Sequence, residues 1–214
     1  MKEVATLIQI VYNSQRDNDN WGGVLPYWAQ CAYTSFIMFL SNWISIARTK
    51  EYETAYVDDT EALVGKPGIA EEAEKKYPWI KGRTGAWFYV HRDACAQRLA
   101  AAGVKGQMVC RAGEPLGGGR INYGTTEEIS AALKSGSPVV VSTKLTDQGH
   151  VVLIVGETFD AWILEDPYGD ARTQYRDPNG HQVQYLKTWF NPLICEKITN
   201  LPNQCVITYF LPGK

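Results

Sequence analysis

The stretch QCAYTSFIMFL (Gln30–Leu40) decides the fold, because it places a cysteine at the start of a strongly apolar segment. Large apolar residues stand at positions 36, 37, 39, 40, 43, 44 and 46, and together they cover nearly the whole circumference of a helix. We therefore predict a helix from Cys31 to about Ala47 that is buried on most sides and forms the centre of the fold.

The position of Cys31 in the first turn of this helix favours reactivity. Backbone N–H groups there have no partner within the helix, and the positive end of the helix dipole is close, so both favour thiolate over thiol. The thiolate is the form of cysteine that acts as a nucleophile. The alternative is that Cys31 packs as a small hydrophobic residue in an ordinary core helix. The helix alone leaves both interpretations open.

Length and charge limit the class of protein. The 214 residues suit one domain, or two lobes that share a cleft. With 21 Lys+Arg against 23 Asp+Glu, the chain has no field that would gather nucleic acid or an anionic membrane. No stretch reaches the roughly 18 to 20 apolar residues of a membrane helix. We therefore expect no nucleic-acid partner and no membrane span.

The N-terminal segment bears on localisation. Its apolar run at residues 4–11 is too short and too polar for a secretory signal, and no small-residue cleavage site follows it. We expect synthesis in the cytoplasm, with possible release to the periplasm or cell wall as a second step.

Five cysteines, an odd number with no CxxC pair, argue against both a disulfide framework and a zinc site. Cys195 and Cys205 could meet across a hairpin, but in a reducing compartment they would remain thiols. The three histidines show no metal-ligand spacing either. We expect no metal and no cofactor.

Helical patterns come first in the chain and strands afterwards. Helices are predicted at residues 69–77 and 93–102, and Thr125–Glu128 reads as a capping box that opens another. The glycine-rich segment 113–119 is predicted as a flexible loop, and its three consecutive glycines as a plain turn rather than a phosphate cradle, because no Lys-Ser/Thr follows. Strands are predicted at residues 7–12, 107–110, 138–142, 150–155, 161–164, 183–185 and 206–210. This order predicts an α+β fold in a single domain over 1–214, with a helical lobe at about 28–104 and a β lobe at about 105–214.

Two of the predicted strands carry a histidine and an acid at their ends. His150 begins the strand GHVVLIVG, and Asp166 ends the strand AWILED just before a proline. If the two strands form a hairpin centred near Thr158, His150 and Asp166 face each other across the ladder. A carboxylate would then lie close enough to orient an imidazole.

Cys31, His150 and Asp166 match the three roles that a cysteine nucleophile requires. The thiol needs a base to take its proton, and the base needs a third group to hold its tautomer. The plainer interpretation is that His150 is only a strand-end histidine and Asp166 only a turn acid. His91 and His181 are the other candidate bases, and we expect both to face solvent.

Four blocks in the chain resemble the C39-like family of papain-fold cysteine peptidases, over residues of about 12 to 190. They are SQRDN (14–18), CxxTSxxMxL (31–40), GHVVLIVG (149–156) and DPYG (166–169). The resemblance implies a papain-like fold in which a helical N-terminal lobe contains the central helix and an antiparallel sheet forms the C-terminal lobe. It also implies that Cys31 is the nucleophile, His150 the general base and acid, and Asp166 the orienting acid.

The resemblance further assigns Gln15 as the side-chain donor of the oxyanion hole. A Gln amide beside the backbone N–H of Cys31 would give two donors to the oxygen that becomes negative. Gln30, which directly precedes the cysteine, is the rival candidate. Gln15 is preferred because it lies in the matching SQRDN block, and because Gln30 would have to fold back on its neighbour.

We therefore expect a cysteine hydrolase that cleaves an amide bond through an acyl-enzyme. Small free-standing papain-like hydrolases are often phage lysins or delivered toxins that act on peptidoglycan cross-links. The expected substrate is therefore a peptidoglycan stem peptide, and the expected activity is that of a bacteriolytic endopeptidase or amidase. Two alternatives stay open. The chain could be a general protein peptidase or acyl transferase of the same chemistry, or a binding module that keeps the fold without catalysis.

Overall fold

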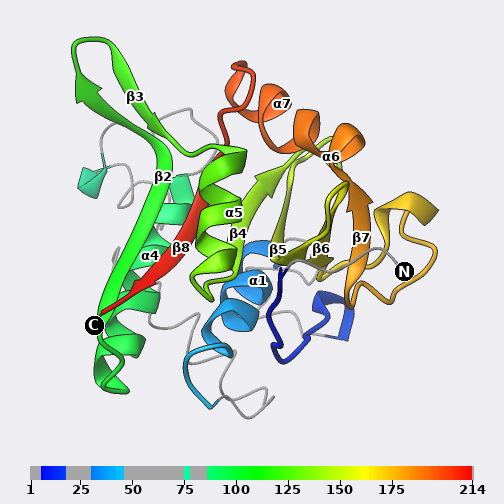
Figure 1. Cartoon of the computed structure of the whole chain (residues 1–214), viewed down its shortest axis with the longest axis horizontal. Coiled ribbons are helices and arrows are strands. Elements are labelled where there is room, and N and C mark those ends of the chain that lie inside the picture. Colours follow the sequence, from blue (N-terminus) through cyan, green and yellow to red (C-terminus); the bar gives the residue numbers. More distant parts are fainter. Residues whose placement is uncertain (1–5, 18–29, 46–74, 78–85, 214) are drawn as a thin grey trace.

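A computed structural model of the chain describes residues 6–17, 30–45, 75–77 and 86–213. An antiparallel sheet of eight strands runs through it (Figure 1), in the order β3-β2-β8-β4-β5-β6-β7, with β1 paired to β5. The strands are β1 (Thr6–Leu7), β2 (Gly106–Gly117), β3 (Arg120–Tyr123), β4 (Val139–Thr143), β5 (His150–Glu157), β6 (Ala161–Glu165), β7 (Val183–Leu186) and β8 (Ile207–Pro212).

Helices cover both faces of the sheet. They are α1 (Cys31–Leu40), α4 (Ala86–Ala101), α5 (Thr126–Lys134), α6 (Lys187–Ile194) and α7 (Glu196–Thr199), with the 3-10 turns η1 (Gln15–Asp17) and η4 (Ala171–Thr173). Side chains of α1 and α4 form one core with Val140 and Leu153, and those of α5 and α6 form a second core with Val141 and Val152. Alternate residues of a strand thus enter opposite cores, as the pleat requires.

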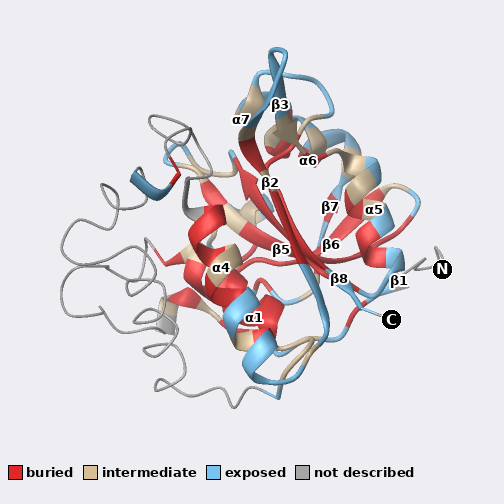
Figure 2. Cartoon of the chain, turned by 90° about the vertical axis from the view of Figure 1, so that its left-hand side faces the viewer, coloured by how far each residue is buried: buried red, intermediate tan, exposed pale blue. Residues whose placement is uncertain are grey.

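This arrangement confirms the predicted α+β fold with a buried central helix. From Tyr33 to Leu40 every residue of α1 is buried, and the buried segments of Figure 2 gather in the sheet and on the helices that face it. The helix is shorter than predicted, because it ends at Leu40 rather than about residue 47. The Ser41 hydroxyl there donates to the Met38 carbonyl at 2.7 Å, which competes with continued helical bonding.

Other boundaries differ in ways that have local causes. Helix α4 begins at Ala86, ahead of the predicted 93, and most of the helix predicted at 69–77 lies outside the described residues. The capping box is confirmed, since the Thr125 hydroxyl accepts from the Glu128 N–H at 3.2 Å. The strand predicted at 7–12 is reduced to Thr6–Leu7.

The flexible loop predicted for residues 113–119 is wrong for most of the segment, whereas the plain turn predicted for its three consecutive glycines is confirmed. Most of this segment continues β2, which pairs with β3 in a hairpin closed at Gly117–Arg120. Gly117, Gly118 and Gly119 have φ values of 82°, 58° and 77°, so the glycines form the tight turn of that hairpin rather than a flexible loop. Glycine and proline within β2 concealed its strand character.

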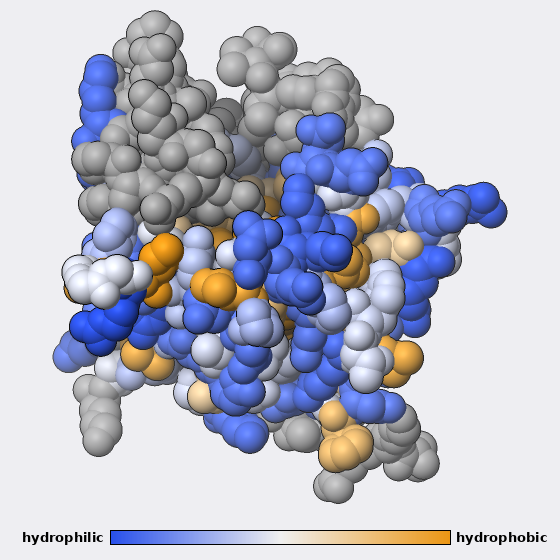
Figure 3. Space-filling model, turned by 90° about the horizontal axis from the view of Figure 1, so that it is seen from above, coloured by the Kyte–Doolittle hydropathy of each residue, from blue (hydrophilic) through white to orange (hydrophobic). Residues whose placement is uncertain are grey.

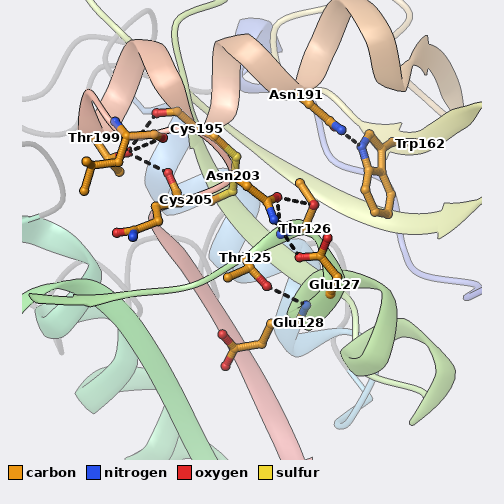
Figure 4. Close-up of a disulfide and its surroundings, with 12 residues drawn as sticks. Thr125, Thr126, Glu127, Glu128, Trp162, Asn191, Cys195, Thr199, Asn203 and Cys205 are labelled. Carbon is orange, nitrogen blue, oxygen red and sulfur yellow. Dashed lines mark hydrogen bonds between the residues drawn. A yellow bond between two sulfur atoms is a disulfide. The ribbon is translucent and has the colours of Figure 1, made fainter.

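Cys195 and Cys205, for which the sequence left both a disulfide and free thiols open, form a disulfide (Figure 4). Cys195 follows α6 and Cys205 precedes β8, so the bond spans α7 rather than a hairpin. The left-handed Asn200 at the end of α7 turns the chain back, which brings the two Cα atoms to 4.3 Å. Asn203, within the loop so closed, accepts from Thr126 and donates to Glu127 at the start of α5.

Figure 3 shows how apolar side chains are distributed over one face of the molecule. Seen from above in Figure 3, apolar side chains of the described residues are scattered among hydrophilic ones and form no broad patch on that face. Among the described helices, none has the length and apolar content to cross a bilayer.

Candidate active site

Cys31 is the first residue of α1, as predicted, and α1 is fastened to the strand that carries His150. The Ser35 hydroxyl, one turn into the helix, donates to the Val151 carbonyl of β5 at 3.0 Å. Cys31 itself is partly buried and hydrogen-bonds the side chain of His150. The helix start and the strand start therefore bring thiol and imidazole together.

His150 and Asp166 form a buried pair. His150 is the first residue of β5, Asp166 directly follows β6, and His150 Nε2 lies 2.7 Å from Asp166 Oδ1. The two side chains are 4% and 0% exposed. Because Nε2 faces the carboxylate, the other ring nitrogen, Nδ1, is left for the thiol.

The pairing register that predicted this contact is wrong, although the contact exists. The β5–β6 turn is closed by Thr158 N–H donating to the Ala161 carbonyl, and a bulge near Val155 adds one residue to β5. Leu153 is therefore opposite Glu165. His150 is a diagonal rather than a direct neighbour of Asp166, and diagonal side chains on one face are within reach when they are long.

Asp166 is held by several groups besides the imidazole. Its Oδ1 also accepts from the Tyr168 N–H at 3.0 Å, and its Oδ2 accepts from the Tyr185 hydroxyl at 3.1 Å. Its backbone is bonded on both sides, with the carbonyl accepting from the Tyr12 hydroxyl and the N–H donating to Gly180. A Cβ at Gly180 would collide with the Asp166 carbonyl oxygen, so this close approach requires glycine.

The charges of Cys31 and His150 support each other. Burial by itself would raise the pKa of the Cys31 thiol, but the hydrogen bond and positive charge of His150, with backbone hydrogen bonds to Val151 and Ala32, outweigh it and lower that pKa. Burial would lower the pKa of His150, but the Asp166 carboxylate and the thiol raise it well above its ordinary value. Both directions favour a thiolate–imidazolium pair.

The other four cysteines are not in comparable surroundings. Cys95 is fully buried, and burial raises the pKa of the Cys110 thiol to about 12. Cys195 and Cys205 are joined in the disulfide. A thiolate at neutral pH is therefore favoured at Cys31 alone.

Gln15 and Gln30 are both buried close to the site. Gln15 opens η1, and its N–H donates to the Pro167 carbonyl at 2.9 Å, one residue from Asp166. Gln30 is the N-cap residue of α1, and its carbonyl accepts from the Thr34 N–H. The Gln15 backbone is thus anchored to the loop that carries Asp166, whereas the Gln30 carbonyl is bonded within its own helix.

The expectation that His91 and His181 face solvent is wrong for His91. His91 is fully buried, because α4 begins earlier than predicted and packs this residue against Phe36, with ring centroids 4.6 Å apart. Burial lowers the pKa of His91 to about 3, so the imidazole stays neutral. The side chain of His181 is 45% exposed, and its Nδ1 lies 2.9 Å from Glu165 Oε2.

Two residues that contact the site escaped the sequence reasoning. Tyr185, on β7, bonds Asp166, and Arg16 lies over the ring of Tyr168 at 4.4 Å from its centroid. Tyr185 is separated from Asp166 by a long loop, so no local pattern indicates the contact. Arg16 belongs to the SQRDN block, and its place next to Gln15 was the available signal.

A cavity of about 590 Å³ lies beside Tyr185, at β7, η4 and α6. Arg172, Gln184 and Trp189 are among its lining residues, and none of Cys31, His150 and Asp166 is. Within the described part of the chain, no three His, Cys, Asp or Glu side chains gather as a metal ion would require.

Comparison with known proteins bears on the family and the fold of the chain. The family model of the Peptidase_C39 like family matches residues 7–191. A Bacillus anthracis protein solved by crystallography and assigned as a C39-like peptidase is similar in structure, with a TM-score of 0.54, 13% sequence identity and 98% of each chain covered. At that identity the likeness concerns the fold alone. No match was found among curated proteins. Because the family model covers most of its length, the chain belongs to the C39-like peptidase family, whose members are cysteine peptidases of papain-like fold.

Proposed function

We propose that the chain hydrolyses an amide bond with Cys31 as nucleophile, His150 as general base and acid, and Asp166 as orienting acid. The observation that carries the proposal is the 2.7 Å bond between His150 Nε2 and Asp166 Oδ1, with the Cys31 thiol bonded to the same imidazole. This is the arrangement by which a carboxylate orients a base and the base activates a nucleophile.

The reaction follows from these positions in two halves. The thiolate of Cys31 attacks the carbonyl carbon of the scissile amide, and the tetrahedral intermediate places a negative charge on the carbonyl oxygen. The His150 imidazolium gives its proton to the leaving amine, and a thioester remains on Cys31. His150 then takes a proton from water, which attacks the thioester, releases the carboxylic acid and restores the thiol.

Gln15 is proposed as the side-chain donor to that negative oxygen, beside the backbone N–H of Cys31. Its anchoring to Pro167 supports this role over that of Gln30. Removing one such donor typically costs about 2.7 to 4 kcal/mol of transition-state stabilisation. Gln15→Ala is therefore expected to lower kcat far more than Gln30→Ala.

The proposed substrate is the stem peptide of peptidoglycan, which makes the chain an endopeptidase or amidase of the endolysin kind. The disulfide between Cys195 and Cys205 supports a working place outside the reducing cytoplasm, where cell walls are found.

Selective alkylation tests the catalytic assignment. Iodoacetamide at near-neutral pH should label Cys31 faster than Cys95 or Cys110, because the pKa of Cys31 is lowered and that of Cys110 is raised. His150→Ala should remove this preference. Equal, slow labelling of the free thiols would instead indicate a binding module.

Mass spectrometry of digested cell walls tests the substrate. The chain should release new stem-peptide fragments from purified peptidoglycan, whereas Cys31→Ala should release none. Cleavage of denatured protein without cleavage of peptidoglycan would identify a general protein peptidase.

A further inference from the structure

Arg16 is fixed next to the candidate catalytic groups by two contacts. Its Nη2 donates to the Tyr175 carbonyl at 2.6 Å, and its guanidinium lies 4.4 Å from the centroid of the Tyr168 ring. It directly follows Gln15 in η1. The side chain is only partly buried, so a ligand can reach it.

The charge of Arg16 has no counter-ion in the described part of the chain. Arg92, Arg111 and Arg172 each pair with a carboxylate, but no ion pair between described side chains involves Arg16. Its Nε–H is moreover buried and has no acceptor among the described residues. A charged donor that is removed from water without an acceptor is costly, so such a group calls for a ligand or a function.

The two tyrosines that hold Arg16 also contact the candidate base. The Tyr168 and Tyr175 rings lie with centroids 6.4 Å and 5.8 Å from that of His150, and 5.1 Å from each other. Arg16 and His150 therefore contact the same two tyrosines. A group bound at Arg16 would lie close to an amide bond placed at Cys31.

The backbone that presents the Tyr175 carbonyl is strained. Gln174 and Tyr175 have φ values of 56° and 60°, a left-handed conformation that non-glycine residues rarely adopt, least of all twice in succession. Such strain persists where surrounding contacts impose it, and it gathers at functional sites. Here it aims a carbonyl at the guanidinium and holds Arg16 in one orientation.

We infer that Arg16 binds a free carboxylate of the substrate, so that the site selects peptides with a carboxylate near the scissile amide. The inference rests on the proposed function and adds the chemical class of its substrate. A guanidinium offers five N–H donors in a planar fork that matches a carboxylate, and Arg16 uses one of them for Tyr175. The remaining donors and the unpaired charge are what a carboxylate would satisfy.

Two pairs of short peptides test the inference. In the first pair, the residue on the acyl side of the scissile bond carries a free carboxylate in one peptide and the corresponding carboxamide in the other. In the second pair, the two peptides differ in the same way at the residue on the amine side. The chain should prefer the carboxylate in at least one pair, by about ten- to a hundredfold in kcat/KM. Arg16→Gln should lose this preference, so that the acid and its carboxamide are cleaved with the same kcat/KM, and Arg16→Lys should keep only part of it, because an ammonium lacks the fork.

Arg176→Gln is the matched control. It removes the same charge from an exposed arginine adjacent to Tyr175, so an effect of general electrostatics would appear in both variants. Melting temperature and the alkylation rate of Cys31 show whether Arg16→Gln keeps the fold and the thiolate.

Binding to Cys31→Ala, measured by calorimetry with the same four peptides, gives a readout that does not depend on turnover. Tighter binding of the carboxylate form that Arg16→Gln abolishes supports the inference even if hydrolysis is never seen, in which case the proposed function fails by itself. Equal handling of acid and amide by the unmodified chain, or a preference that survives in Arg16→Gln, overturns the inference.

Discussion

Two histidine–carboxylate pairs meet the end of β6, and only one of them adjoins a thiol. Glu165 and Asp166 are consecutive, so their side chains leave the strand on opposite faces. Asp166 pairs with His150 at 2.7 Å and Glu165 with His181 at 2.9 Å. The separations are nearly the same, so distance alone does not tell a catalytic pair from a structural one.

The two histidine–carboxylate pairs differ in their surroundings. The His150 side chain is 4% exposed, whereas the His181 side chain is 45% exposed and has the Tyr12 ring for a neighbour, with centroids 5.6 Å apart. Around His150, the Asp166 carboxylate raises the pKa of the imidazole and lowers that of Cys31 through it. Around His181, burial raises the pKa of Glu165, and no neighbouring side chain among the described residues is activated as a nucleophile. The His150 pair therefore differs from the His181 pair in having a thiol as a third group and in being buried from solvent.

The largest expected effect comes from removing each imidazole in turn. His150→Ala should lower kcat/KM for the peptide substrate by about a thousandfold or more, because the base that forms the thiolate is lost. His181→Ala should leave kcat/KM within about threefold. Steady-state kinetics on both variants checks this, and a large loss in His181→Ala would show that the second pair also takes part in the reaction.

Replacing each acid by its amide should give the same contrast in kcat/KM between the two pairs, with a smaller effect. Asp166→Asn keeps the shape but cannot stabilise the imidazolium, so kcat/KM should fall on the order of a hundredfold. Glu165→Gln removes the neighbouring charge and should change kcat/KM by no more than about threefold. The pH dependence of Cys31 alkylation reports the cause, since Asp166→Asn should move the rise in rate to higher pH and Glu165→Gln should not.

The elements of this comparison differ in how far the sequence predicts them. Cys31 at a helix start and His150 at a strand start were predicted, because capping and strand patterns are local. The pairing of β5 with β6 was not predicted, since the bulge near Val155 depends on packing from both cores. The contact nevertheless formed because His150 and Asp166 still project from one face.

Long-range partners were the least predictable part. Tyr185 contacts Asp166 across a loop whose shape depends on three residues with left-handed backbone, Gln174, Tyr175 and Gln182. Glutamine and tyrosine rarely adopt this conformation, so the sequence does not predict it. His181 was expected in solvent because its Pro-Asn-Gly turn is polar, and the buried acid that it meets could not be read from that turn. The four family blocks place the reacting groups, whereas the residues that support them emerge only from the fold.

Tyr185 offers a finer test of the role proposed for the His150–Asp166 pair. Tyr185→Phe keeps the buried ring and removes only the hydroxyl that bonds Asp166 Oδ2 at 3.1 Å. The Asp166 carboxylate then loses one of the hydrogen-bond donors that fix its position, so kcat should fall about tenfold. KM should not change, because Tyr185 is fully buried and cannot touch substrate.

Tyr209→Phe is the matched control for this change. Tyr209 is also buried, and its hydroxyl bonds a different carboxylate, Glu128, at 2.6 Å. Its kcat should stay unchanged. If both variants lost activity equally, or if KM rose in Tyr185→Phe, the hydroxyl would not act by holding Asp166.

The smallest expected effect concerns the stability that the structural pair contributes. His181→Ala leaves the Glu165 carboxylate buried with only the Gln182 N–H as donor, at 3.2 Å. The free energy of unfolding should fall by about 1 kcal/mol at neutral pH, a modest value because the histidine is partly exposed. In Glu165→Gln, which carries no charge at that position, the same substitution should cost almost nothing, so a double-mutant cycle isolates the pair.

The pH dependence of that loss has a definite sign. Burial already raises the folded-state pKa of Glu165 above its ordinary 4.5, and the bond to His181 opposes the rise. Without His181 the pKa rises further, so the folded chain keeps a proton that the unfolded chain has released. The stability deficit of His181→Ala should therefore be small below the ordinary pKa of glutamate, where Glu165 is protonated in the folded and the unfolded state. It should grow as the pH rises through the raised folded-state pKa of Glu165. Urea unfolding at about pH 4 and about pH 5.5, a range in which an ordinary histidine stays protonated, measures it, and a deficit that shrinks between these two values would contradict the pairing.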